Sequence, residues 1–314
     1  MNQPLLSIII PHYNGVHHLR PCFEALRQQN YQHYEIILVD NGSHDESVAV
    51  TRRDFPEVQV LELGHNFGFT CAVNRGIKQA QGEVIVPLNN DTEAAPQWAQ
   101  AVVDTLAAYP DAGMVACKML LFDRRDTLHS AGDGFGTNGI PINRGVWQKD
   151  VGQFDHARYI FGGCGGAVAY RRAMLDDIGL LDEDLFMYLE DVDLNWRAQL
   201  AGYRVVFAPQ AVVYHQLSAT GGGVVASYYT GRNTLWVLAK NLPRHIWQRH
   251  HRAIISAQLE IATSALKAWR GEAARARLRG QLAGLRGLPH WFAKRQNITQ
   301  RVSDSYIENL LTVI

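Results

Sequence analysis

Short apolar runs alternate with amphipathic segments along the first 120 residues of the chain. The apolar runs have the length of buried strands and lie at residues 6–10, 34–39, 58–63, 83–88 and 113–120. Segments with apolar residues at helical spacing lie between them, at residues 16–29, 69–80 and 95–109. Because this alternation is typical of parallel sheets buried on both faces, we predict an α/β fold with a mostly parallel central sheet flanked by helices.

The pattern changes after residue 120. Residues 121–160 are rich in Gly, Asp and Asn and predict long loops. Regular patterns then return at residues 166–179 and 188–202, with two predicted strands at 204–208 and 211–215. From residue 240 onward the pattern is purely helical. Two largely apolar stripes follow the helical period there: Trp247, His251, Ile254, Ile255, Gln258, Ala262, Leu266 and Trp269, then Leu278, Leu282 and Leu285.

The charge of the chain divides at the same place. The 314 residues have a net charge of zero, but residues 1–239 hold 17 Lys/Arg and 26 Asp/Glu. Residues 240–301 hold 13 Lys/Arg against Glu260 and Glu272, a net charge of +11. A basic helical region beside an acidic body predicts an anionic partner for that region. A membrane surface is one expectation and packing on the body or on a second subunit is the other, whereas nucleic acid is disfavoured by the acidic body.

Composition adds limits on the cellular setting. The hydrophobic content is 47%, enough for a sizeable core. Four cysteines stand far apart with no CxxC pair, which favours reduced thiols and a cytoplasmic protein. The first residues lack a basic leader and predict a strand instead of a signal peptide. No run of about 18 apolar residues is present to span a membrane.

Polar side chains gather where the predicted strands end. Residues 11–14, residues 40–43, Asn66 and residues 89–91 all follow apolar runs. In open α/β sheets ligands bind beyond the carboxyl ends of the strands, although turn formation alone explains any one of these clusters. Asp40 could accept hydrogen bonds from a base or a ribose. Asp91 could bind Mg²⁺ or Mn²⁺ together with a diphosphate, because these ions favour oxygen ligands.

A second acidic cluster lies at the predicted N-terminus of a helix. Glu190 and Asp191 are adjacent there, where the helix dipole favours carboxylates, and one of them could accept a proton from a hydroxyl. Asp193 and Arg197 have the spacing of an exposed helical ion pair, which is the simpler interpretation of Asp193. His215 ends a predicted strand, and its imidazole is either structural or a further metal ligand.

Two glycine-rich stretches are not nucleotide fingerprints. Gly134, Gly136 and Gly139 match G-x-G-x-x-G, but no strand precedes them and Pro141 follows, which disfavours an oxidoreductase. Residues 161–166 (FGGCGG) lack the Lys-Ser/Thr of a phosphate-binding loop. Their glycines are better explained by close approach of the backbone to a ligand.

Together these segments resemble the family 2 glycosyltransferases of the GT-A fold, and among them bacterial rhamnosyltransferase-like members that build cell-surface polysaccharides. The resemblance covers about residues 5–240. The segments that carry it are SIIIPHYNG, IILVDNGSHDES, HNFGFTCAVNRGI, PLNNDT, GGCGGAVAYRR, LFMYLEDVDLNWRAQLAGY and VYHQLSAT. It implies a catalytic domain over 1–239, with a nucleotide-binding half at 1–115 and an acceptor half at 116–239, followed by a basic helical region at 240–314.

The resemblance also implies a role for each candidate residue. The nucleotide and donor sugar would meet Pro11, Tyr13, Asp40, Asn66, Gly68, Asn74 and Asn90. The metal-binding D-x-D is NND here, so Asn89 replaces its first Asp and Asp91 is the main carboxylate, with His215 as a second ligand. Asp191 matches the catalytic base and Glu190 lies beside it. Weaker matches at the edge of the site are Gly163, Arg232 and Asn233.

The implied reaction is inverting transfer of a sugar from a nucleoside-diphosphate sugar, such as dTDP-L-rhamnose or a UDP-sugar, to a saccharide or lipid-linked saccharide. The cofactor would be Mg²⁺ or Mn²⁺. A catalytically silent nucleotide-sugar-binding protein is the alternative. The enzyme would be cytoplasmic, with peripheral contact at the inner face of the membrane through 240–301 or a homo-oligomer as the open choices. The acceptor, the linkage and the oligomeric state do not follow from the sequence.

Overall fold

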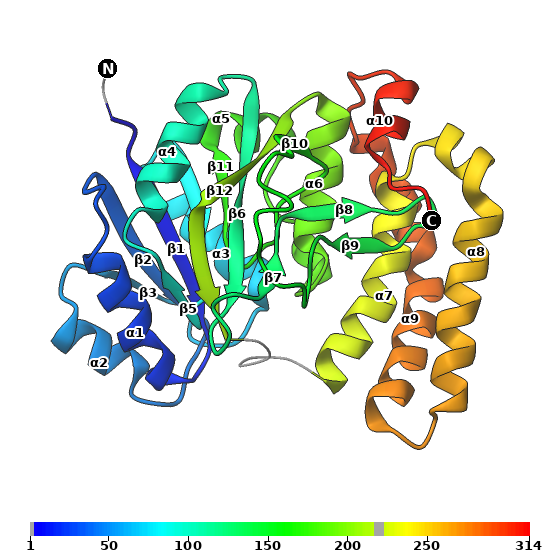
Figure 1. The fold of residues 1–314 in the computed structure, drawn as a ribbon. Coiled ribbons are helices and arrows are strands. Elements are labelled where there is room, and N and C mark those ends of the chain that lie inside the picture. The colour runs from blue at the N-terminus through cyan, green and yellow to red at the C-terminus, as the bar shows by residue number, and fades with distance from the viewer. Residues whose placement is uncertain (1–2, 217–222) are drawn as a thin grey trace.

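The computed structural model describes residues 3–216 and 223–314, which form a central sheet with helices on both faces and a helical layer at one side (Figure 1). The described strands of the main sheet follow the order β10-β12-β6-β11-β4-β1-β2-β3, with β5 and β7 added on β12 and β6. The strands are β1 (Leu6–His12), β2 (Tyr34–Asp40), β3 (Gln59–Glu62), β4 (Val84–Pro87), β5 (Thr92–Ala94), β6 (Ala112–Leu121), β7 (Leu128–Ser130), β10 (Tyr159–Ile160), β11 (Val168–Arg171) and β12 (Arg204–His215).

The predicted fold class is confirmed, although one half of the sheet contains antiparallel as well as parallel strand pairs. β1 pairs in parallel with β2 and β4, and β2 pairs in parallel with β3. β11 inserts antiparallel between β4 and β6, and β12 runs parallel to β6. The carboxyl ends of β1, β2 and β4 therefore share one edge of the sheet.

Helices cover both faces of the sheet, and every residue of the central strand β1 is therefore buried. Ile8 and Ile10 point into the cluster beneath α1 and α4, whereas Ile9 points into the opposite cluster with Val73 and Ile77 of α3. The flanking helices are α1 (Val16–Arg27), α2 (Ser47–Asp54), α3 (Phe69–Gln79), α4 (Trp98–Ala108), α5 (Arg172–Ile178) and α6 (Glu190–Ala201).

The helical layer consists of α7 (Val224–Asn241), α8 (Arg244–Lys267), α9 (Glu272–Lys294) and α10 (Asp304–Leu310). It lies beside α6, on the side of the molecule away from β2 and β3 (Figure 1). A third cluster joins it to the body, where Trp196 of α6 is buried with Val237 of α7 and Trp291 of α9. No helix in the described ranges is long and apolar enough to cross a bilayer.

The sequence analysis missed α2 and β5, and two further details differ from its expectation. Residues 121–160 contain the short strands β7 and β10 and the hairpin β8 (Asp133–Phe135) with β9 (Pro141–Asn143), each too short to produce a clear alternation. The two strands predicted at 204–215 are one, since β12 continues along β6 through a register shift between Ala208 and Val212. The expected division between residues 239 and 240 falls inside α7; that division stays a prediction.

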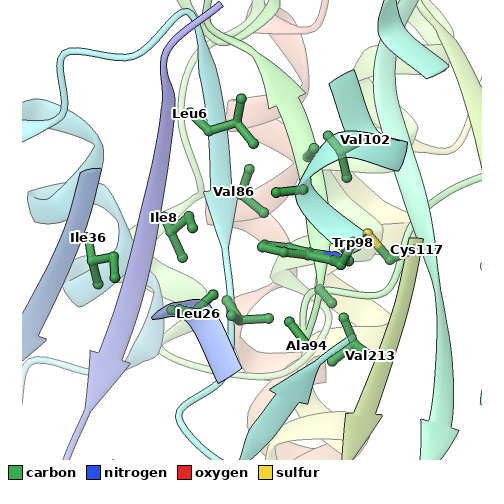
Figure 2. Close-up of a cluster of buried hydrophobic side chains, with 14 of the residues drawn as sticks. Leu6, Ile8, Leu26, Ile36, Val86, Ala94, Trp98, Val102, Cys117 and Val213 are labelled. Carbon is green, nitrogen blue, oxygen red and sulfur yellow. Dashed lines mark hydrogen bonds between the residues drawn. The ribbon is translucent and has the colours of Figure 1, made fainter. Parts of the chain in front are cut away.

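Trp98 lies at the centre of the cluster beneath α4 (Figure 2). Its ring is fully buried, and its indole N–H points at the Cys117 sulfur, 3.3 Å away. The large apolar surface of this one side chain connects α4 to the strands.

We expect Trp98→Ala to lower the free energy of unfolding by about 3–5 kcal/mol, because it leaves a cavity in the core. Trp269→Ala is the matched control, since Trp269 is 60% exposed. Urea denaturation of both variants measures the difference. Equal midpoints for the two variants would contradict the central position of Trp98.

Candidate active site

The carboxyl edge of the sheet brings the first group of predicted site residues together. His12 and Asp40 end neighbouring strands and are register partners. Asp40 is buried, and its carboxylate accepts N–H groups of Gly42 (3.2 Å) and Ser43 (3.1 Å), so it shapes the turn after β2. Tyr13 is 41% exposed just beyond β1, which leaves its ring accessible to a ligand.

The side chain of Asn90 is hydrogen-bonded to His12, a residue that the sequence analysis did not single out. The Asn90 amide donates to His12 Nδ1 (2.6 Å), and His12 Nε2 then donates to the Ser47 hydroxyl (2.7 Å). Ser47 donates in turn to Asp45. Burial lowers the pKa of His12 to about 4, although Asp45 and Asp40 oppose the shift, so the imidazole is neutral. This chain of bonds fixes the segment before Asp91.

Asp91 and His215, the two predicted metal ligands, lie side by side. β12 pairs with β5 so that His215 faces Thr92, which places its Nε2 atom 3.2 Å from Asp91 Oδ1. Asp91 is buried, and this oxygen has no hydrogen-bond partner within the described ranges. The amide of Asn89 lies 3.3 Å from the same His215 nitrogen.

His129 of β7 is a further residue that the sequence analysis missed. Its ring stacks on His215 with centroids 4.7 Å apart, and the two Nδ1 atoms are 3.2 Å apart. Burial, together with the charge of His215, lowers the pKa of His129 to about 4. A second group on the far ring nitrogen is how proteins orient a metal-binding histidine. The segment had no strand pattern, so no signal pointed to His129.

Asp91 and His215 fit a metal ion that takes most of its ligands from substrate phosphates and water. No group of three or more His, Cys, Asp or Glu side chains among residues 3–216 and 223–314 is arranged to hold a metal ion. Mg²⁺ commonly binds through one or two carboxylates and completes its shell with substrate phosphates and water. A buried carboxylate oxygen without a partner, beside an imidazole nitrogen, suits that role.

The second acidic cluster lies where α6 begins. Asp191 accepts the N–H of Gly165 (2.7 Å) and that of Val192 (2.8 Å), which fixes the orientation of its carboxylate. Burial raises the pKa of Asp191 above its ordinary value, while these N–H groups oppose the shift. The carboxylate is therefore a stronger base than the free side chain assumed from the sequence.

Glu190 and Asp133 surround Asp191 with carboxyl groups that resist ionisation. Burial raises the pKa of Glu190 to about 8, and the charge of Asp191 contributes. Burial, again with the charge of Asp191, raises the pKa of Asp133 well above its usual range. Asp133 comes from the hairpin that the sequence did not predict, and no pattern pointed to it. The three groups cannot all be charged at neutral pH.

The glycine segment at 161–166 contacts both the Asp191 carboxylate and the backbone that leads to Asp91. Gly165 donates to Asp191, and the next residue, Gly166, accepts from the backbone N–H of Asn89 (3.0 Å). Gly163 is buried against α6, where it exchanges two hydrogen bonds with the Asn195 side chain. A Cβ atom at Gly162 would lie 2.1 Å from Asn195. The first glycines therefore allow close packing, and only Gly165 and Gly166 approach the candidate site.

Arg232 and Asn233, predicted at the edge of the site, hold the loop that leads into α6. Phe186, Tyr188 and Leu189 have left-handed φ angles of 65–67°. The Asn233 amide donates to the carbonyls of Leu185, Met187 and Tyr188, and Arg232 donates to that of Leu185. Non-glycine residues adopt such angles only where their surroundings impose them. These two residues thus position the carboxylates that follow.

Three residues predicted to meet the nucleotide also support this loop. The buried Asn74 amide donates to the Leu181 carbonyl (2.8 Å) and to Glu183 (3.0 Å). Asn66 accepts the N–H of Gly68, and a Cβ atom on Gly68 would lie 2.5 Å from the Phe186 ring. Their contact with a nucleotide stays a prediction. The end of the last motif, residues 217–220, lies outside the described residues.

The interpretation of Asp193 and Arg197 as an exposed ion pair is wrong. Asp193 has no exposed surface, and it accepts from Arg197 (2.9 Å), Lys240 (2.9 Å) and Asn241 (2.7 Å). Burial alone would raise its pKa, but the charges of Arg197 and Lys240 lower it to about 2. The helical spacing was correct, but the partners come from α7 and were not visible in the local sequence.

Comparison with known proteins gives a consistent result. The family model described as Glycosyl transferase family 2 matches residues 7–179. The O-antigen biosynthesis protein RfbC of Myxococcus xanthus is 30% identical over 227 residues, which cover 69% of this chain and 18% of that protein. The chain thus spans less than a fifth of that relative. The N-acetylglucosaminyl-diphospho-decaprenol L-rhamnosyltransferase of Mycobacterium tuberculosis is 27% identical over 242 residues, covering 69% of this chain and 78% of that enzyme.

The fold is similar to that of a solved glycosyltransferase. The mannosyltransferase PcManGT from Pyrobaculum calidifontis, in complex with GDP-Man and Mn²⁺, superposes with a TM-score of 0.58. The alignment covers 95% of this chain and 85% of that one at 17% identity. At this identity the likeness concerns the fold.

The raised pKa of Glu190 predicts a pH effect on stability. Between about pH 5 and 8 the native protein keeps a proton on Glu190 that the unfolded chain releases, so this group makes the free energy of unfolding fall as pH rises. We expect Glu190→Gln to flatten that fall, as measured by urea denaturation from pH 5 to pH 9. Glu260→Gln, at an exposed position of α8, should keep the wild-type slope. Parallel curves for wild type and Glu190→Gln would refute the assignment.

Proposed function

Since the chain belongs to glycosyl transferase family 2, we propose that it transfers a sugar, with inversion, from a nucleoside-diphosphate sugar to a hydroxyl group of a saccharide or lipid-linked saccharide. The two relatives named above act, by their names, in O-antigen synthesis and in L-rhamnosyl transfer to a lipid-linked sugar. They support a role in cell-surface polysaccharide synthesis, with dTDP-L-rhamnose as the first donor to test and UDP-sugars as the next.

One observation carries this proposal: one short backbone segment bonds both to the Asp191 carboxylate and to the backbone just before Asp91. Gly165 contacts Asp191, and Gly166 contacts Asn89 two residues before Asp91. The candidate base for the acceptor and the candidate anchor for the departing diphosphate are thus connected through adjacent glycines of one segment. Direct displacement needs both groups around one anomeric carbon.

The chain's own residues divide the work as follows. Asp191 removes the proton from the acceptor hydroxyl while that oxygen forms the new bond to the anomeric carbon. The bond from that carbon to the diphosphate oxygen breaks, and its electron pair leaves with the nucleoside diphosphate. Asp191 is held in position by Gly165 and Val192, and burial raises its affinity for the proton. A divalent cation held by Asp91 and His215 would supply positive charge to the leaving diphosphate.

The direct test is a panel of nucleotide-sugars, each incubated with the protein with and without Mn²⁺ while release of the nucleoside diphosphate is measured. Release from one donor, dependent on the metal, supports the proposal. Binding of a nucleoside diphosphate without release from any donor, also in the presence of saccharide acceptors, would instead indicate a catalytically silent binding protein.

Asp91→Ala should abolish metal-dependent binding of the nucleoside diphosphate, because the next acid along the chain, Glu93, is paired with Arg125. Calorimetry with the nucleoside diphosphate and Mn²⁺ measures this loss. Asp104→Ala, an exposed acid on α4, is the control and should bind as wild type does. Unchanged affinity in Asp91→Ala would exclude the metal role.

Asp191→Asn should preserve the fold and donor binding but lower turnover by roughly 10²–10⁴-fold, the usual contribution of a general base. Glu190→Gln should have a smaller effect, since the pKa of Glu190, raised to about 8, keeps it protonated at neutral pH. Single-turnover rates with a competent donor decide between them. Near-normal turnover in Asp191→Asn, with loss in Glu190→Gln, would reverse the assignment.

A further inference from the structure

An open groove of about 960 Å³ lies between α8 and α9, and residues of α7 also line it. Its walls are the apolar stripes of the two helices: Ile255, Leu259 and Leu266 on α8 and Leu278, Leu282 and Leu285 on α9. Leu259 and Leu266 are 60% and 57% exposed, and Leu282 is 53% exposed. The two stripes face a common space without closing it.

The groove is not explained by a poorly attached helix. α8 has 24 residues, of which Ile246, Ile254 and Ala265 are buried. Its first half is fixed to α10 by polar contacts, including His245 to Asp304 (2.9 Å) and His250 to Glu308 (3.2 Å). A fixed amphipathic helix normally covers its apolar stripe, and an uncovered stripe of this size marks a binding surface.

The positive charge of the helices that form the groove favours one kind of binding partner over the others. Exposed arginines at positions 252, 270, 279 and 286 lie on α8, on α9 or in the turn between them, and form no ion pair within the described ranges. Residues 240–301 carry a net charge of +11. A second copy of the chain would bring two positively charged surfaces together, which repel each other. A nucleic acid would match the charge but would not bury the apolar side chains of the groove. Anionic lipid offers both hydrocarbon and negative charge.

Aromatic side chains add a second sign of a lipid partner. Trp247 and Phe292 line the groove, and Trp269 follows α8; all three are exposed. Such rings favour the boundary between hydrocarbon and headgroups, and basic amphipathic helices with this composition lie in the plane of that boundary. No described helix crosses a bilayer, so the contact would be peripheral.

We propose that the α8–α9 groove takes up hydrocarbon chains of anionic membrane lipids and so docks the protein on a bilayer surface. The leucines of the two walls contact the chains, and the surrounding arginines contact the phosphate headgroups. The proposal does not depend on the donor, the acceptor or the reaction.

α7 connects this surface to the candidate active site. Leu235 and Leu238 of α7 line the groove, while Asn233 of the same helix holds the loop that leads to Asp191. Docking through the groove would therefore place the candidate site within one helix of the lipid surface.

The test is co-sedimentation of the full-length protein with vesicles of phosphatidylcholine alone or mixed with phosphatidylglycerol, at several salt concentrations. We expect binding to the anionic vesicles, weakening as salt rises. Leu259→Gln with Leu282→Gln should reduce it about tenfold through lost apolar burial. The control pair is Val151→Gln with Val313→Gln, which are exposed outside the groove and should change nothing.

A second set of variants tests the charge. Arg270→Gln, Arg279→Gln and Arg286→Gln together should weaken binding to anionic vesicles by about a hundredfold. The control variant replaces Arg52, Lys78 and Arg158 by Gln, all exposed and outside α8 and α9, and should bind almost as wild type does. Protein that stays in the supernatant with both kinds of vesicle overturns the proposal, as does a leucine variant that binds normally. A dimer in light scattering that the leucine variant dissociates would also overturn it and assign the groove to a second copy.

Discussion

A single buried carboxylate, Asp193, determines where the rest of the candidate site can lie. It is fully enclosed and is bound by a cation on its own helix, Arg197, and by Lys240 and Asn241 on α7. An unpaired charge in such a place would be strongly destabilising, and removal of one partner from a buried pair typically costs about 3–5 kcal/mol. The helices α6 and α7 are therefore fixed against each other, and Asp191, two residues earlier on α6, is fixed with them.

The same constraint explains why the loop before α6 can hold an unfavourable backbone. Three residues between 186 and 189 have left-handed angles, and Asn233 on α7 compensates by donating to three carbonyls of this loop. Backbone strain of this kind costs on the order of 1–3 kcal/mol per residue and persists only in a rigid frame. Lys240 and Lys294 supply part of that frame by sharing Asp182. The geometry of the candidate site thus depends on helices that contribute neither of its candidate carboxylates.

The sequence predicted the sheet, most of the strands and helices along residues 1–120, and the two acidic clusters, because each has a local signature. β1, β2 and β4 are continuous apolar runs, and Asp91 directly follows such a run. The residues it did not predict act over long separations. His129 reaches His215 across 86 positions, and His12 reaches Asn90 across 78. No local pattern encodes such contacts. The misread Asp193 belongs to the same class, since helical spacing reveals Arg197 but not Lys240.

The role of α7 bears on how the chain divides into parts. The charge and the helical pattern both change near residue 240, which suggested a boundary there, but Lys240 and Asn241 are ligands of Asp193. The C-terminal helices also bury Trp291 beside Trp236, with ring centroids 5.0 Å apart. A catalytic part that ended before residue 240 would leave Asp193 with Arg197 as its remaining cation and would expose one face of α7. The basic helices therefore cover α7 beside the candidate site, and a partner that occupies their groove would act on the same helix that holds the loop before Asp191.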